Sequence, residues 1–358
     1  MNSVHGRGRF ARRCPRRLCG GVLAVVAVGL FGACSSDDSA TSTTAPTTPA
    51  ATAEGSAGCS PARPADAGTA PKTFMQGDRE RTYLLTIPEA YDGTTPAPII
   101  VNLHGALGTG EKVNTSSQMP EKAGERGYIV VAPDALSSKV ETGGGEIEGG
   151  IWNLAPAFAD PMTGSTTTVQ AEMAGDDDIA FINGLLDSLE QELCVDTARE
   201  YAAGKSAGAG MTTFLSCQPS PRFAAVAPVA GVNMPKFCVG SDVPPMITFH
   251  GDADRPMPYA GGTVVGIDLG VPDVDTRVDE VAAKGQCEPP TEEQIADDVV
   301  HRVWSCPDGN AVELYKVLGG GHTWPGEDPS GVGTLGVVTD NIDATELMLD
   351  FFDQHTKA

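Results

Sequence analysis

Short apolar runs recur along this chain of 358 residues, and they constrain its fold more than any other feature. The clearest lie at 98–103, 128–132 and 246–249. Strands with so few polar residues are buried on both faces, as in a parallel sheet that helices cover on each side. Further strand-like segments are 81–88, 200–203, 224–229 and 312–317.

Helical segments separate these strands. Residues 177–194 carry apolar side chains at helical spacing and begin with acidic residues, which interact favourably with the helix dipole. The alternation of strands and helices predicts one doubly wound α/β domain with a mostly parallel sheet and helices on both faces. Residues 134–175 are rich in Gly, Ser and Thr, and we expect an irregular loop or a small cap there. No internal repeat is present in the sequence.

The charge of the chain excludes one class of partner. The formal net charge is −23, and the first 33 residues contain six Arg and no acidic residue, so the remainder is more acidic still. Such a body repels nucleic acid. We therefore expect no nucleic-acid partner.

The N-terminus is typical of an exported protein. Residues 1–33 combine an Arg-rich start with a short apolar stretch, which predicts a signal peptide. The stretch ends in Phe31-Gly32-Ala33-Cys34, which resembles a bacterial lipoprotein cleavage box with Cys34 as the lipidated residue. The alternative is ordinary cleavage near Ala33 and free secretion. Residues 34–58 are rich in Ser, Thr, Ala and Pro and predict a disordered linker, followed by a catalytic domain at 59–358. We expect an extracellular or cell-surface protein that meets a membrane only through the lipid.

Six of the nine cysteines lie beyond Cys34, an even number that predicts three disulfides in an exported chain. Cys287 and Cys306 bracket one polar segment and form the first candidate pair. Two further candidate pairs are Cys217 with Cys238 and Cys59 with Cys194.

Gly204-Lys205-Ser206-Ala207-Gly208 lies between a strand-like run and a helix-like run. A serine on such a turn has its hydroxyl exposed at the edge of the sheet, and the glycines give room for the tight backbone. The amide of Ala207 would then lie at a helix N-terminus, where it can donate to an oxyanion. The motif predicts Ser206 as a nucleophile. The alternative is a small-residue loop that only connects two elements.

Three more motifs follow the ends of strands, where open α/β sheets carry their chemistry. His104-Gly105-Ala106 offers the Ala106 amide as a second oxyanion donor. The segment from His250 offers Asp252 and Asp254, one of which is needed to orient a catalytic histidine. Three glycines precede His322, the candidate base. The order serine, aspartate, histidine is that of α/β-hydrolases.

A metal site formed by three histidines is an alternative to the triad. His104, His250 and His322 have spacings that match no short ligand motif, and a metal would leave Ser206 unexplained. We therefore expect no metal and no cofactor.

Together these motifs resemble the family of extracellular polyhydroxybutyrate depolymerases, which also contains feruloyl and acetylxylan esterases. The most specific element is Gly-Gly-Gly-His-Thr-Trp-Pro-Gly at 319–326, and the resemblance spans about residues 73–355. It implies an α/β-hydrolase fold and serine carboxylic-ester hydrolysis. It places the nucleophile at Ser206, the base at His322 and the acid at Asp254, with Asp252 as the alternative. It also implies a bridge in the segment between Cys287 and Cys306.

Some residues depart from the family pattern or are open to two interpretations. Lys205 is unusual beside the nucleophile, and it either binds anionic substrates or points to solvent. Trp152 and Trp324 either line a substrate cleft or pack in the core. His104 is a further substrate-binding candidate. No polymer-binding module is evident after the catalytic body.

The sequence thus predicts acyl transfer from an ester to Ser206 and then to water. His322 acts as the base, Asp254 orients it, and the amides of Ala106 and Ala207 bind the oxyanion. Two alternatives are an acyltransferase or peptidase on the same scaffold and a surface lipoprotein that binds a ligand without catalysis. The sequence does not define the acyl group, the alcohol or the oligomeric state.

Overall fold

The computed structural model describes residues 55–142, 145–154, 177–218, 222–233, 243–264 and 270–357. The expected signal peptide, Cys34 and nearly all of the expected linker lie outside the described residues, as does Cys238. In the described part of the chain, no helix is both long enough and apolar enough to cross a membrane.

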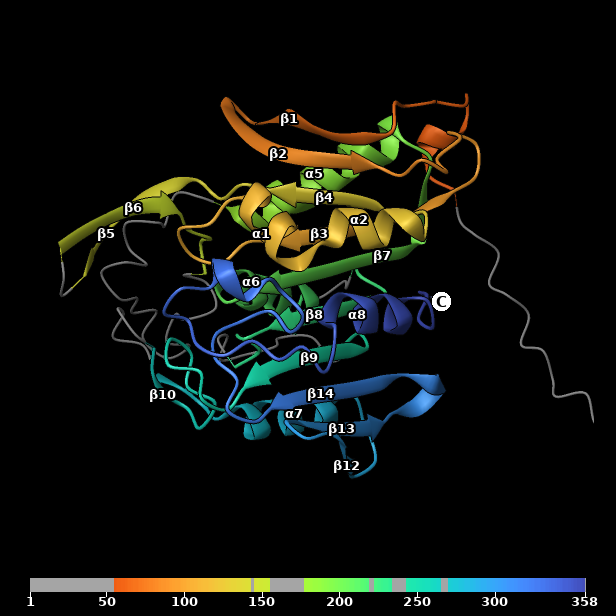
Figure 1. Cartoon of the computed structure of the whole chain (residues 1–358). Coiled ribbons are helices and arrows are strands. Elements are labelled where there is room, and N and C mark those ends of the chain that lie inside the picture. Colours follow the sequence, from red (N-terminus) through yellow and green to blue (C-terminus); the bar gives the residue numbers. More distant parts are fainter. Residues whose placement is uncertain are drawn as a thin grey trace, which may run out of the picture. The chain divides into compact units, whose positions relative to one another are not determined.

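A ten-stranded sheet forms the centre of the fold, in the order β1-β2-β4-β3-β7-β8-β9-β14-β13-β12 (Figure 1). The strands are β1 (Gly68–Gln76), β2 (Arg79–Ile87), β3 (Ala97–Leu103), β4 (Ile129–Pro133), β7 (Val195–Lys205), β8 (Ala225–Val229), β9 (Met246–Gly251), β12 (Thr291–Ala296), β13 (Val299–Ser305) and β14 (Ala311–Val317). The strands from β4 to β14 in this order are parallel, and the outer pairs are antiparallel. All strands that we expected are present.

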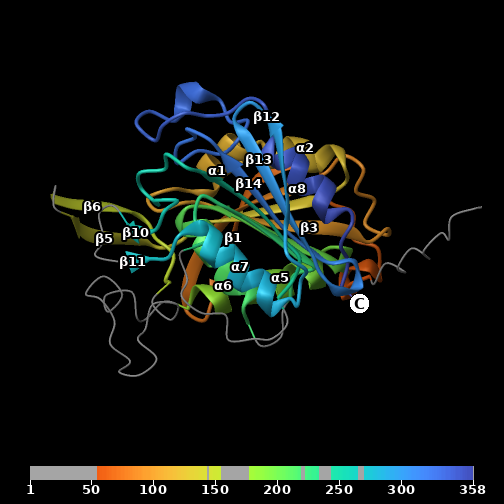
Figure 2. The same cartoon turned by 90° about the horizontal axis from the view of Figure 1, so that it is seen from below.

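Helices cover both faces of this sheet (Figure 2). One layer contains α1 (Gly110–Ser117), α2 (Met119–Glu125) and α8 (Ala344–Phe352), and the other contains α5 (Asp178–Glu192), α6 (Ala207–Ser216) and α7 (Val274–Lys284). Each face has its own apolar core. Along β3, for example, Ile99 and Val101 pack into the core that contains α5, whereas Ile100 packs into the core that contains α8. This alternation follows from the pleat of a strand buried on both faces.

The segment 134–175 differs in part from the expected irregular loop. Its first half contains a two-stranded hairpin, β5 (Ser137–Thr142) and β6 (Gly145–Gly150). Residues 155–176 lie outside the described residues. The second strand contains three glycines, a residue type depleted in strands, so composition concealed the hairpin. A second small ribbon joins β10 (Gly262–Thr263) to β11 (Gly270–Val271).

The folded body begins before residue 59, which corrects the expected linker boundary. Ser56 is buried, its N–H donates to Val195 O at 2.8 Å, and its hydroxyl donates to Leu193 O at 2.7 Å. Gly58 packs so closely on Leu193 that a Cβ would lie 2.1 Å from the Leu193 carbonyl oxygen. The described chain is therefore attached to the start of β7 from Gly55 onward.

Two of the three expected disulfides are present. Cys59 is bonded to Cys194 across 135 residues, and Cys287 is bonded to Cys306 across 19 residues. The second disulfide closes the β12–β13 hairpin. The remaining candidate pair, Cys217 with Cys238, involves a residue outside the described part of the chain.

We expect the Cys59–Cys194 disulfide to stabilise the fold more than Cys287–Cys306. The longer loop loses more entropy in the unfolded chain, by about 5 kcal/mol against about 3 kcal/mol in the chain-entropy model. Urea unfolding of the Cys59→Ala/Cys194→Ala and Cys287→Ala/Cys306→Ala variants measures both losses. A larger loss of unfolding free energy in Cys287→Ala/Cys306→Ala than in Cys59→Ala/Cys194→Ala would contradict the expectation.

Candidate active site

Ser206 occupies a sharp turn between β7 and α6. It has φ 58° and ψ −119°, a strained combination for a residue with a Cβ. The two glycines of the motif stand where a side chain would not fit. A Cβ on Gly204 would lie 2.5 Å from the Gly208 carbonyl oxygen, and a Cβ on Gly208 would lie 2.1 Å from the Leu103 carbonyl oxygen. The turn is thus held by close backbone packing against the end of β3.

His322 lies in the loop that follows β14, and its Nδ1 is 2.7 Å from Oδ2 of Asp254. Both side chains are buried. The glycines before the histidine permit the close backbone contacts of this loop. A Cβ on Gly321 would lie 2.3 Å from the Leu335 carbonyl oxygen, and a Cβ on Gly251 would lie 2.2 Å from the Gly320 carbonyl oxygen. The loop is therefore packed against the end of β9, from which Asp254 follows.

Asp254 is held as a carboxylate. Its Oδ1 accepts from the Met257 N–H at 2.8 Å, and its Oδ2 lies 3.4 Å from His250 Nε2 as well as beside His322. Burial alone would raise the pKa of Asp254, but the interactions with His250 and His322 outweigh it and lower the pKa to about 2. An ionised Asp254 accepts a hydrogen bond, so Nδ1 of His322 carries the proton and Nε2 is left as the basic nitrogen.

Asp252 is exposed and takes a different role. Its Oδ1 accepts from the Gly319 N–H at 2.6 Å. It therefore caps the loop that leads to His322, and its hydrogen bond is to the backbone of that loop and not to the histidine ring. Of the two candidate acids, the structure brings Asp254 to His322.

The loop after β3 approaches Ser206 from the other side. A Cβ on Gly105 would lie 3.2 Å from Ser206 Cβ and 3.8 Å from Ser206 Oγ, so this backbone passes beside the hydroxyl. Ala106 comes next in the chain, and Ala207 begins α6. Among the backbone hydrogen bonds that the described residues make with one another outside regular elements, none uses the N–H of Ala106 or Ala207.

Comparison with known proteins identifies the fold. No family model matches the chain. The structure of an acetyl xylan esterase from Aspergillus awamori superposes with a TM-score of 0.54 at 15% identity, covering 80% of this chain and 99% of that chain. The chain has the α/β-hydrolase fold.

Several sequence relatives of the chain are esterases by name. Feruloyl esterase B of Piromyces equi is 26% identical over 251 residues, which are 68% of this chain and 42% of that protein. Putative esterase NocK of Nocardia uniformis subsp. tsuyamanensis is 26% identical over 308 residues, 80% of this chain and 83% of that protein. The chain spans about half the length of the first curated relatives it matches. The resemblance to feruloyl and acetylxylan esterases inferred from the motifs is confirmed.

His104 has a structural role in place of the expected substrate contact. Its Nε2 accepts from the Ala135 N–H at 3.0 Å, so its Nδ1 carries the proton and donates to Gly105 O at 2.7 Å. Burial lowers the pKa of His104, in agreement with a neutral ring. His104 therefore holds the loop that contains Ala106.

The two candidate cleft tryptophans are core residues, each 1% exposed. Trp152 packs against the ring of His104 and donates from Nε1 to His104 O at 2.8 Å. Trp324 donates from Nε1 to Thr345 Oγ1 at 3.0 Å and lies in the core that contains α8. Of the two interpretations of these residues, core packing is correct. Trp152 thus supports the loop that begins at His104, and Trp324 anchors the loop that contains His322.

Lys205 neither points to solvent nor stands free to bind an anionic substrate. Its Nζ donates to Glu327 Oε1 at 2.8 Å, and both side chains are largely buried. Sequence reasoning did not identify Glu327, and nothing near Lys205 in the chain indicates it. Sequence reasoning also missed the contact between His250 and Asp254, although both residues belong to the same motif.

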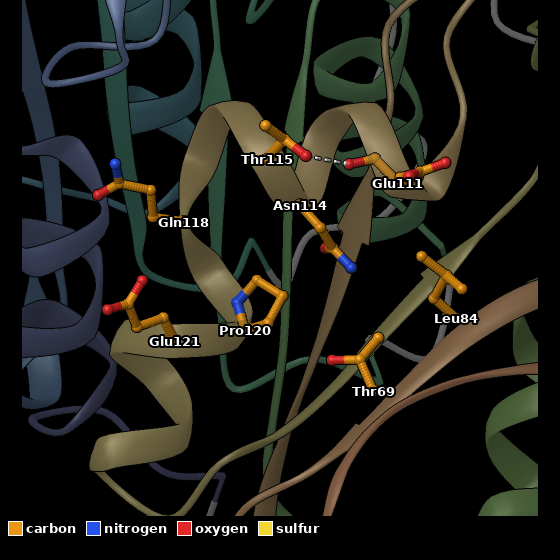
Figure 3. Close-up of a pocket in the computed structure, with 8 residues that line it drawn as sticks. All are labelled: Thr69, Leu84, Glu111, Asn114, Thr115, Gln118, Pro120 and Glu121. Atoms are coloured by element: carbon orange, nitrogen blue, oxygen red, sulfur yellow. Dashed lines mark hydrogen bonds between the residues drawn. The ribbon is translucent and has the colours of Figure 1, made fainter.

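A cavity of about 310 Å³ lies apart from these residues, between α1, α2 and the strands β1 and β2 (Figure 3). Its lining includes Thr69, Asn114, Gln118 and Glu121. None of the residues placed near Ser206 or His322 contributes to it. In the described part of the chain, no group of three or more His, Cys, Asp or Glu side chains is arranged to hold a metal ion.

The ionisation of Asp254 predicts a pH dependence of stability. Because its folded pKa of about 2 is below the ordinary value of 3.8, it contributes stability that is present above about pH 4 and is lost as the pH falls through about 2. The contribution is about 2 kcal/mol. Urea unfolding at neutral and at strongly acidic pH should therefore show a smaller acid loss in Asp254→Asn than in the wild type. An equal loss in both proteins would contradict this.

Proposed function

We propose that the chain is an exported serine carboxylic-ester hydrolase with Ser206, His322 and Asp254 as its triad. The observation that carries the proposal is the 2.7 Å contact between His322 and a buried, ionised Asp254, in a fold that presents Ser206 on a strained turn. A buried acid that fixes the histidine tautomer is the arrangement that nucleophilic serine catalysis requires.

The reaction follows from these positions. His322 Nε2 takes the proton of the Ser206 hydroxyl, and the oxygen attacks the ester carbonyl. The amides of Ala106 and Ala207 donate to the oxyanion, and the imidazolium is stabilised by Asp254. The imidazolium then returns the proton to the alcohol oxygen as the C–O bond breaks. His322 then takes a proton from water as the water oxygen attacks the acyl-enzyme carbonyl. The imidazolium returns this proton to Ser206 Oγ as the bond to the acyl group breaks and the carboxylic acid leaves.

The substrate class proposed is a feruloyl or acetyl ester of a plant cell-wall polysaccharide. Support comes from the names of similar proteins, feruloyl esterases in sequence and an acetyl xylan esterase in structure. A polyester such as polyhydroxybutyrate is the alternative that the motif resemblance leaves open.

Export is supported by the disulfides Cys59–Cys194 and Cys287–Cys306, because such bonds persist in oxidising compartments. We propose that Cys34 carries the lipid that retains the protein at the cell surface. Metabolic labelling with a fatty-acid probe tests this, with Cys34→Ala as the control. Equal labelling of both proteins would contradict the lipid anchor.

An ester panel tests the substrate class. The full-length protein is assayed on p-nitrophenyl esters from acetate to palmitate, on methyl ferulate, on acetylated xylan and on a polyhydroxybutyrate suspension. We expect high kcat/KM on acetyl or feruloyl esters and little on palmitate. Hydrolysis confined to polyhydroxybutyrate would move the assignment to a depolymerase, and no hydrolysis of any ester would contradict the proposed function.

A further inference from the structure

A buried ion pair adjoins the proposed nucleophile. Lys205 is the last residue of β7 and immediately precedes Ser206, and its Nζ donates to Glu327 Oε1 at 2.8 Å. The Lys205 side chain is 13% exposed and the Glu327 side chain 5% exposed. Solvent screens such a pair much less than it screens a surface pair. Removing one partner therefore leaves a charge that water compensates poorly.

The other end of the pair lies in the His322 loop. Oε1 of Glu327 also accepts from the Trp324 N–H at 2.6 Å, and the Glu327 N–H donates to Trp324 O at 3.0 Å. Glu327 thus closes a turn that begins two residues after His322. One carboxylate oxygen therefore joins the residue before Ser206 to the backbone just after His322.

The topology explains why such a connection is needed. Ser206 follows β7 and His322 follows β14, and β8 and β9 lie between these two strands in the sheet. Hydrogen bonds of the sheet therefore do not set the distance between the two loops directly. A misplacement of about 1 Å can cost about a hundredfold in rate, so contacts between the loops matter for catalysis.

We infer that Lys205 and Glu327 are positioning residues, whose ion pair holds the His322 loop against the Ser206 turn. The inference rests on the proposed function, because it assigns these residues a role in that reaction. Neither residue contacts the reacting atoms. Each acts through its neighbour, Lys205 through Ser206 and Glu327 through the turn after His322.

The pair also balances charge around the base. Other charged or titratable groups of the described residues also face the His322 loop. Asp254 contacts His322 and His250, and Asp252 accepts from the Gly319 N–H. Asp343, which pairs with Lys122, lies beside Gly326, where a Cβ would be 3.2 Å from Asp343 Oδ2. Loss of Lys205 leaves an extra negative charge near His322, which favours its protonated, inactive form. Loss of Glu327 leaves an extra positive charge and has the opposite effect. The two substitutions should therefore move the acid limb of the pH–rate profile in opposite directions.

The experiment compares the full-length wild type with Lys205→Met, Glu327→Gln and the double variant. Lys357→Met is the matched control, because Lys357 pairs with the buried Glu200 on the same strand as Lys205 but away from the site. Rates on p-nitrophenyl acetate are measured across the acidic and neutral range. We expect kcat to fall about 10-fold to 100-fold in each single variant with little change in KM.

We expect the acid limb to move upward by about half a pH unit in Lys205→Met and downward by a similar amount in Glu327→Gln. In the double variant, the limb should lie near that of the wild type while kcat stays low. Lys357→Met should keep the wild-type limb and kcat. Limbs that stay in place, or that move in the same direction in both single variants, would overturn the inference.

A second measurement does not depend on catalysis. Amide hydrogen exchange of the peptide that covers 318–327 should be faster in Lys205→Met than in the wild type and unchanged in Lys357→Met. Unchanged exchange in Lys205→Met would overturn the inference. If the wild type hydrolysed no ester while the exchange still differed, the proposed function would fail and the contact between the loops would stand.

Discussion

Ser206→Ala should lower kcat on p-nitrophenyl acetate by at least about 10⁴-fold, because the hydroxyl that forms the acyl-enzyme is removed. The fold should persist, since alanine fits the same turn with a smaller side chain. Residual hydrolysis would come from water attack assisted by the amides of Ala106 and Ala207. The measurement is steady-state kinetics, with thermal unfolding to show that the variant is folded.

Ser216→Ala is the matched control for this substitution. Ser216 is a buried serine at the other end of α6, and its hydroxyl donates to Thr213 O at 2.7 Å. Its loss removes one hydrogen bond, about 1 kcal/mol of stability, without touching the site. Ser216→Ala should therefore keep the wild-type kcat. Equal rates for Ser206→Ala and the wild type would remove Ser206 as nucleophile.

Asp254→Asn should lower kcat by about 10⁴-fold, while Asp252→Asn should change it by less than about threefold. The difference follows from their contacts. An amide nitrogen in place of Asp254 Oδ2 would donate to His322 Nδ1 and favour the tautomer whose Nε2 is protonated and unable to act as a base. Asp252 is exposed, and its side chain accepts from the Gly319 amide.

Kinetics of both variants on the same ester measure this difference. Circular dichroism and thermal unfolding show whether each variant has kept its fold. A large loss in Asp252→Asn with near wild-type rates in Asp254→Asn would reverse the assignment of the acid. Similar losses of kcat in both variants would indicate that the rate depends on the conformation of the loop that leads to His322 and not on the acid.

The central strands and the candidate site could be predicted from the sequence because their information is local. Each central strand is a short apolar run, and Ser206, Asp254 and His322 each follow such a run in a segment that contains glycine. Parallel strands bring their carboxyl ends to one edge, so these three motifs could be expected to meet. The residues alone do not distinguish Asp252 from Asp254, because two carboxylates two residues apart have the same local sequence context. The family resemblance favours Asp254, and the contact of its Oδ2 with His322 Nδ1 agrees with that choice.

The interactions that were missed depend on distant partners. Lys205 and Glu327 are 122 residues apart, and no local pattern links them. For the tryptophans the sequence leaves both a cleft position and core packing open, because it does not show which groups their indoles contact. Trp152 and Trp324 are buried, since His104 O and Thr345 Oγ1 satisfy their indole N–H groups.

Helix α1 could not be recognised from the sequence, for a different reason. Helix α1 contains Gly, Asn, Thr and two Ser, and only one of its residues, Val113, is a large apolar residue, so neither helix propensity nor periodicity marks it. It is held by tertiary contacts instead. Asn114 Oδ1 accepts from the buried Asn102 Nδ2 of β3 at 2.9 Å, and Thr109 caps the helix N-terminus.

Covalent trapping tests the central claim most directly. The wild type is incubated with a fluorophosphonate, which reacts with activated serines, and the modified peptide is located by mass spectrometry. We expect one added phosphonyl group on the peptide that contains Ser206, slower labelling in Asp254→Asn and none in Ser206→Ala. Ester hydrolysis that continues while Ser206 remains unlabelled, or a label on another residue that abolishes hydrolysis, would contradict it.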